Sequence, residues 1–250
     1  MKNKLEVKNK IKALEISIVA IIICGIFYYI AQILKFPYMQ SSLIKITLFL
    51  IVPSAYFIIR KKKVVLQNMF KIKSIKEIKL GLILVSILIL IASSLMLLVY
   101  NIDEFRNLAM QAGNTINKTL NNFILTSLYI VCINAFLEEF FFRGIVFLEL
   151  NKTANKTYAM IFSAILFSLY HLAIFQPGME PFMYIIGYII LFFTGLIFNY
   201  IDSHSKNIYN SWIVHAAANM SINLFGIYIL INLKWGKTNE NVWYYWKKIE

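Results

Sequence analysis

Residues 80–100 read LGLILVSILILIASSLMLLVY, a run that contains no charged side chain. A helix needs about 20 predominantly apolar residues to cross the hydrocarbon core of a bilayer, and this run is long enough. Lipid offers no hydrogen-bond partners to the backbone, whereas a helix pairs its own N–H and C=O groups. The run therefore predicts a transmembrane helix and sets the fold class of the chain.

The rest of the chain has the same character. Of its 250 residues, 60% are hydrophobic and 15% are charged, which is more apolar surface than a soluble domain of this length can bury. We predict an all-α fold, a polytopic transmembrane helical bundle of about seven to eight spans, the eighth being a re-entrant or missed element. The seven ranges that the pattern predicts are 16–34, 43–59, 80–100, 123–150, 158–175, 182–201 and 208–233.

The domain organisation follows from these spans. We predict an N-terminal three-span region with basic cytoplasmic segments at 1–119, a catalytic helical core at 120–233 and a C-terminal tail at 234–250. Cys24 and Cys132 both fall inside apolar stretches. Their placement argues against a disulfide framework or a zinc-finger spacing, and both are interpreted as small apolar side chains.

The formal charge of +13 comes from lysines that lie beside the apolar spans. This placement is typical of membrane topology rather than of a soluble basic face, so no nucleic-acid partner is expected. The lysine-rich N-terminus and residues 60–79 should face the cytoplasm and anionic lipid. Seven spans then place the C-terminus outside, although the lysines of the tail favour the other side. Residues 64–79 form either an interfacial helix or a solvated basic loop.

The fourth predicted span contains Glu138, Glu139 and Arg143 among phenylalanines. An ionisable residue at membrane depth costs about 2.5–3.5 kcal/mol, so three together indicate a function. Glu139 and Arg143 are at i and i+4 and can form a pair, while Glu138 points about 100° away. We assign the chemistry to Glu138 and the structural pairing to Glu139. The alternative is a cytoplasmic helix end whose charged side chains reach water.

Two of the three histidines also lie in apolar helices: His171 in the fifth span and His215, four residues before Asn219, in the seventh. A single histidine of this kind is usually a satisfied core residue, but the set resembles a hydrolytic site. Glu138 could take a proton from water that His171 also holds, and His215 with Asn219 could stabilise an oxyanion.

A metal site is the competing interpretation, because Glu and His are also zinc ligands. The chain has no His-Glu-x-x-His arrangement, and no two histidines are spaced to bind one metal from a single helix. We therefore expect no cofactor, although zinc is possible. Sequence signatures for serine, aspartyl and cysteine proteases are poorly supported.

The order of these residues resembles the CPBP family of intramembrane glutamic endopeptidases. This family comprises the CAAX prenyl proteases and bacterial relatives associated with bacteriocin processing and self-immunity. The family pattern is Glu-Glu-x-x-x-Arg, then Phe-x-x-x-His, then His-x-x-x-Asn, and here it is met by residues 138–143, 167–171 and 215–219. The likeness covers roughly residues 120–225.

The resemblance implies specific roles and a substrate class. Glu138 is the expected catalytic base and His171 assists it, His215 and Asn219 form the oxyanion site, and Glu139 with Arg143 supports the others. The substrate would be a membrane-associated peptide or protein. The Ile, Lys and Asn content suggests a bacterium, so we expect a multi-pass protein of the bacterial plasma membrane. The alternatives are a non-catalytic membrane adaptor or a bacteriocin self-immunity protein of the same fold, and a transporter is disfavoured.

Overall fold

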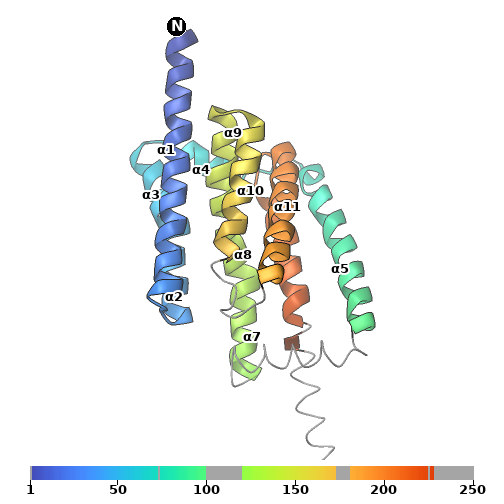
Figure 1. Cartoon of the computed structure of the whole chain (residues 1–250). Coiled ribbons are helices and arrows are strands. Elements are labelled where there is room, and N and C mark those ends of the chain that lie inside the picture. Colours follow the sequence, from blue (N-terminus) through green and yellow to red (C-terminus); the bar gives the residue numbers. More distant parts are fainter. Residues whose placement is uncertain (1, 73, 100–119, 173–180, 225, 228–250) are drawn as a thin grey trace, which may run out of the picture. The chain divides into compact units, whose positions relative to one another are not determined.

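The computed structural model describes residues 2–72, 74–99, 120–172, 181–224 and 226–227, and each regular element in those ranges is a helix (Figure 1). This confirms the all-α class. Some segments are wider π-helices or a tighter 3₁₀ turn rather than α-helices. The elements are α1 (Lys2–Tyr28), π-helix η1 (Tyr29–Ile33), α2 (Tyr38–Ile46), π-helix η2 (Thr47–Ile51), α3 (Val52–Ile59), α4 (Lys63–Met69), 3₁₀-helix η3 (Ile75–Glu77), α5 (Lys79–Val99), α7 (Leu120–Leu128), π-helix η4 (Tyr129–Asn134), α8 (Ala135–Glu139), π-helix η5 (Phe140–Leu148), α9 (Glu149–Thr153), α10 (Lys156–Leu172), α11 (Pro181–Ser205) and a helix over residues 209–224.

A helix lies at each predicted span, and the protein is a membrane protein. Among the described residues, three helical stretches are long and apolar enough to cross a bilayer: Asn3–Ile33, Tyr38–Ile59 and Tyr184–Ser205. The first begins well before the predicted residue 16, because the lysine-rich arm continues the same helix. The total of seven to eight spans stays a prediction. The tail at 234–250 lies outside the described residues.

The chain forms two compact units that do not follow the order of the sequence. The first unit contains Met1–Leu82 and Phe136–Ile213, and the second contains Ile83–Ala135 and Val214–Glu250. The boundaries predicted at 119 and 233 stay a prediction.

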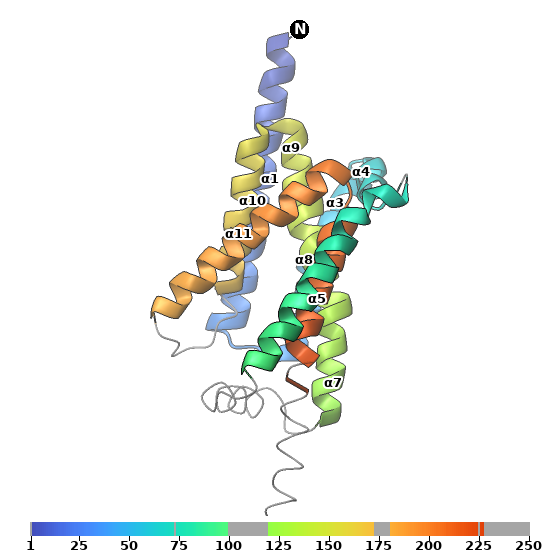
Figure 2. The same ribbon diagram turned by 90° about the vertical axis from the view of Figure 1, so that its right-hand side faces the viewer.

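In the first unit, α10 packs against α11 and η5, and α1 packs against α9 and α10. Figure 2 shows α11 crossing α10 obliquely. A Cβ on Gly195 of α11 would lie 3.0 Å from the Cα atom of Ala164 in α10. The glycine therefore permits the close approach of these two helices. Phenylalanine rings from η2, η5 and α10 form the centre of the core: Phe49, Phe141, Phe142, Phe147 and Phe167.

Residues 65–70 pack onto the same core. Within the range 64–79 the chain forms two short helices, α4 and η3, and their position at the membrane interface stays a prediction. Met69 at the end of α4 is buried, and its Sδ atom would lie 2.9 Å from a Cβ placed on Gly144 of η5. The missing side chain at Gly144 thus makes room for α4 against the helix that carries the predicted site.

That helix changes its winding directly after the two glutamates. η5 is a nine-residue π-helix, and all of its residues are buried. Segments of π-helix inside α-helices are rare and occur frequently at functional sites. The change of winding follows Glu139 immediately, so it sets the direction in which Arg143 and the phenylalanines project.

The second unit holds its helices together with polar contacts. The Ser127 hydroxyl of α7 donates to the Asn223 side-chain oxygen at 2.8 Å. A Cβ on Gly226 would lie 2.8 Å from the Phe123 ring, so a side chain there would force the ring to move.

Candidate active site

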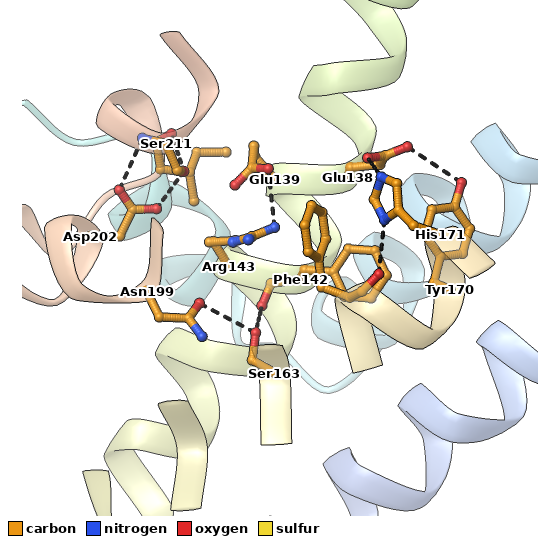
Figure 3. Close-up of polar contacts among 12 residues, drawn as sticks. Glu138, Glu139, Phe142, Arg143, Ser163, Tyr170, His171, Asn199, Asp202 and Ser211 are labelled. Atoms are coloured by element: carbon orange, nitrogen blue, oxygen red, sulfur yellow. Dashed lines mark hydrogen bonds and ion pairs between the residues drawn. The ribbon is translucent and has the colours of Figure 1, made fainter. Parts of the chain in front are cut away.

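Glu138 lies at the meeting point of three elements of the first unit, and its side chain is 1% exposed. One carboxylate oxygen, Oε2, lies 3.2 Å from His171 Nε2 on α10 (Figure 3). The other, Oε1, lies 2.6 Å from Lys45 Nζ on α2. The Tyr170 hydroxyl donates to Oε1 at 3.4 Å. The two oxygens of this buried carboxylate therefore have different partners.

The imidazole of His171 is fixed by its other nitrogen. Nδ1 lies 2.8 Å from the carbonyl oxygen of Phe167, one turn earlier in α10. A carbonyl only accepts, so Nδ1 carries a proton and donates it. Nε2 then faces Oε2 of Glu138 at 3.2 Å. Glu138 and His171 are therefore in direct contact, and the His171 side chain is the more exposed of the two, at 17% against 1%.

Glu139 and Arg143 form a second buried pair on another side of the helix. Nη1 of Arg143 lies 3.1 Å from Oε1 of Glu139, and both side chains are 0% exposed. The guanidinium carbon lies 4.0 Å and 4.8 Å from the ring centroids of Phe167 and Phe198. The i,i+4 spacing predicts this pair and the structure contains it. The alternative of a helix end with side chains reaching water is wrong, because the three charged groups are buried.

Lys45 is the partner that sequence analysis missed. It lies in the predicted span 43–59. A lysine inside an apolar span indicates a functional or structural role, because placing its charge in the membrane costs free energy. The partner of this lysine is 93 residues away along the chain, so no local spacing connects the two. Tyr170 was also missed, and no sequence pattern distinguishes it from the other tyrosines.

A further set of buried polar contacts holds the helices around these pairs (Figure 3). Asp202 of α11 accepts hydrogen bonds from the Ser211 backbone N–H at 3.2 Å and from its hydroxyl at 2.6 Å. The Ser163 hydroxyl of α10 donates to the Phe142 carbonyl at 2.9 Å. Asn199 of α11 donates to the Met160 carbonyl at 2.9 Å. These bonds connect α11 to α10 and to the start of the helix over 209–224, and α10 to η5.

His215 and Asn219 belong to the second unit. His215 is buried, with 7% of its surface exposed. The Asn219 side-chain amide donates to the Ile130 carbonyl of η4 at 3.3 Å, and its backbone carbonyl accepts from Asn223 at 2.7 Å. The Asn219 side chain therefore links the helix over 209–224 to the π-helix η4. Glu138 and His171 belong to the first unit, whereas His215 and Asn219 belong to the second, so the predicted oxyanion site stays a prediction.

Metal ligands do not gather in the described part of the chain. No group of three His, Cys, Asp or Glu side chains is arranged there to hold an ion. The metal-free mechanism nevertheless stays a prediction. Cys24 and Cys132 are free thiols.

Taken together, a buried glutamate in contact with a histidine and a lysine forms a candidate acid–base site in a helical membrane protein. Residues 120–221 match the family model described as Rce1-like, the type II CAAX prenyl endopeptidases. The match confirms the resemblance to this family over those residues and supports a protease. No curated protein and no solved structure matches the chain. The matched range includes Glu138, His171, His215 and Asn219, whereas Lys45 precedes it.

Proposed function

We propose that this protein is an intramembrane endopeptidase in which Glu138 and His171 activate water against a peptide bond. The observation that carries the proposal is the contact of 3.2 Å between His171 Nε2 and Glu138 Oε2, where a buried carboxylate meets an imidazole of fixed orientation. An acid–base pair of this kind can both accept and return a proton, which amide hydrolysis requires.

The proposed reaction has no covalent intermediate. The Glu138 carboxylate takes a proton from water while the water oxygen adds to the amide carbon, and the carbonyl oxygen becomes an oxyanion. His215 and Asn219 are proposed, from the family resemblance, to donate hydrogen bonds to that oxyanion. The proton then passes to the leaving nitrogen as the C–N bond breaks. The carboxylate is regenerated, and the products are a new carboxylic acid and a new amine.

The fixed imidazole gives His171 its part in this sequence. Because Nδ1 is held by the Phe167 carbonyl, Nε2 is the ring atom that faces Glu138 and exchanges the proton. His171 is also the more exposed member of the pair, at 17% against 1% for Glu138. We therefore place the attacking water beside His171 Nε2 and Glu138 Oε2.

The substrate that we propose is a membrane-associated peptide or protein. The matched family is named for CAAX prenyl substrates, and Lys45 of the charged site lies in an apolar helical stretch long enough to cross a membrane. Residues 60–63 are exposed and basic, which suits contact with anionic lipid at the cytoplasmic surface. We place the protein in a bacterial plasma membrane on its composition.

The direct test is cleavage of a library of membrane-tethered peptides by detergent-purified protein. Glu138→Gln removes the base, and we expect a loss of about 100-fold or more in cleavage rate. Glu149→Gln is the matched control, because Glu149 is equally buried and is paired with Lys12 and Lys152. Rates are expressed per amount of folded protein. We expect wild type and Glu149→Gln to cleave at similar rates.

Two outcomes would contradict the proposal. Cleavage by Glu138→Gln at the wild-type rate would remove Glu138 from the chemistry. No cleavage by any folded variant of a broad library would favour the non-catalytic adaptor or self-immunity protein.

A further inference from the structure

Lys45 is buried in an otherwise apolar helix and lies against the predicted base. It is 3% exposed and belongs to the helical stretch Tyr38–Ile59, which is long enough to cross a membrane. Its Nζ atom lies 2.6 Å from Oε1 of Glu138. The resemblance to known proteases assigns no role to this residue, since the matched range begins at residue 120.

Aromatic rings surround the ammonium group of Lys45. Nζ lies 4.9 Å from the ring centroid of Tyr170, 5.5 Å from that of Phe49 and 6.0 Å from that of Phe27. A cation over the face of an aromatic ring is attracted by the negative charge density there. Phe49 is itself held by stacking on Phe141 at 4.4 Å. The rings therefore fix the ammonium group in one place.

This placement decides what each oxygen of Glu138 can do. A carboxylate buried in apolar surroundings takes up a proton and becomes neutral unless a cation lies beside it. A neutral carboxylic acid cannot act as a base towards water. Lys45 supplies the positive charge, and it does so at Oε1, so that Oε2 is left directed at His171.

We propose that Lys45 is a positioning residue of the active site: it keeps Glu138 ionised and holds its second oxygen towards His171. The proposal rests on the peptidase function proposed above. Lys45 acts through Glu138, so it is needed for turnover of bound substrate and contributes little to substrate binding.

The first test is the steady-state kinetics of Lys45→Met on a peptide that wild type cleaves. We expect kcat to fall by roughly 10- to 100-fold, part of what a general base contributes, while KM stays within about twofold. Lys12→Met is the control, because Lys12 also pairs with a buried glutamate, Glu149, at 3.0 Å. Its kcat should equal that of wild type. An unchanged kcat in folded Lys45→Met would overturn the proposal, and so would an increase.

If Lys45→Met does not fold, Lys45→Gln provides the same kinetic test. The glutamine amide can still donate a hydrogen bond towards Glu138 but carries no charge. A loss of kcat with an unchanged KM supports the proposal, and wild-type kcat overturns it.

The second test uses thermal stability and does not depend on activity. Lys45→Met, Glu138→Gln and the double variant form a double-mutant cycle. Each single change leaves one buried charge beside a neutral side chain and should lower the melting midpoint by about 10 °C. The double variant removes both charges. Its melting midpoint should therefore fall by much less than the sum of the decreases in the two single variants. Simple addition of the shifts would show that the pair is not coupled and would overturn the proposal.

The two tests separate the possible failures. If wild type cleaves nothing but the stability cycle shows coupling, the peptidase proposal fails and the Lys45–Glu138 pair is structural. If wild type and Lys45→Met cleave equally, the peptidase proposal stands and the role of Lys45 is wrong.

Discussion

Glu139→Gln tests the division of roles between the two adjacent glutamates. The variant removes the negative charge from a pair in which both side chains are 0% exposed and the Nη1–Oε1 distance is 3.1 Å. Arg143 keeps its charge in a site from which water is excluded, and its Nε and Nη2 atoms have no hydrogen-bond partner among the described residues. We therefore expect the change to act on folding and not on the reacting groups.

The expected size follows from this burial. Removing one partner of a buried ion pair costs about 3–5 kcal/mol. Glutamine keeps one acceptor, and the stacking of Arg143 on the rings of Phe167 and Phe198 survives, so we expect the lower end, about 3 kcal/mol. A chain of this length loses about 2–4 °C per kcal/mol, which gives a fall in the melting midpoint on the order of 10 °C.

A thiol-reactive fluorescent dye can follow the unfolding in detergent. Cys24 is buried and becomes reactive only when the helices separate, whereas Cys132 is exposed and is removed as Cys132→Ser. Glu6→Gln is the matched control, because Glu6 pairs with Lys10 at the same i,i+4 spacing but both side chains are largely exposed. The control should show no resolvable shift, since exposed pairs contribute little.

Equal midpoints for Glu139→Gln and Glu6→Gln would refute the assignment of a structural role to the Glu139–Arg143 pair. A Glu139→Gln protein that is stable but inactive would reverse the roles of Glu138 and Glu139.

Two further predictions use the same preparation. Gly195→Ala should lower the melting midpoint by the equivalent of about 1–3 kcal/mol, because its methyl group would meet the Ala164 backbone at 3.0 Å. Gly25→Ala, whose Cβ meets nothing within 4 Å, should leave the midpoint unchanged or raise it; equal losses for both glycines would contradict the packing described for α10 and α11. Removal of divalent metal by a chelator should leave peptide cleavage unchanged, whereas restoration of a chelated enzyme by added zinc would establish a metal mechanism.

The helices were predictable because their signal is local. The uncharged apolar run at residues 80–100 predicts a helix, and α5 (Lys79–Val99) lies there; its crossing of the membrane stays a prediction. The start of the first helix was not predictable to the same extent. The lysines of the arm do not stop a helix, so α1 begins at Lys2 rather than near residue 16. The π-helical geometry of η5 could not be predicted, because no sequence pattern used above distinguishes a π-helix from an α-helix.

Within the candidate site, the pairs that were predictable are those set by helical rotation. Glu139 and Arg143 meet because they are four residues apart, and Glu138 points elsewhere because it is one residue away. His171 could be selected as a rare histidine in an apolar helix. Its contact with Glu138, and the contact of Lys45 with the same carboxylate, depend on how separate helices pack. No spacing within one helix contains that information.

The distance along the chain between Lys45 and Glu138 has a consequence for biosynthesis. The two residues are 93 positions apart, so at a synthesis rate of about 5–20 residues per second the ribosome adds Glu138 roughly 5 to 20 s after Lys45. During that interval the nascent helix enters the membrane with a lysine whose carboxylate partner has not yet been made. Its apolar neighbours must offset an insertion cost of about 2.5–3.5 kcal/mol until the later helix arrives.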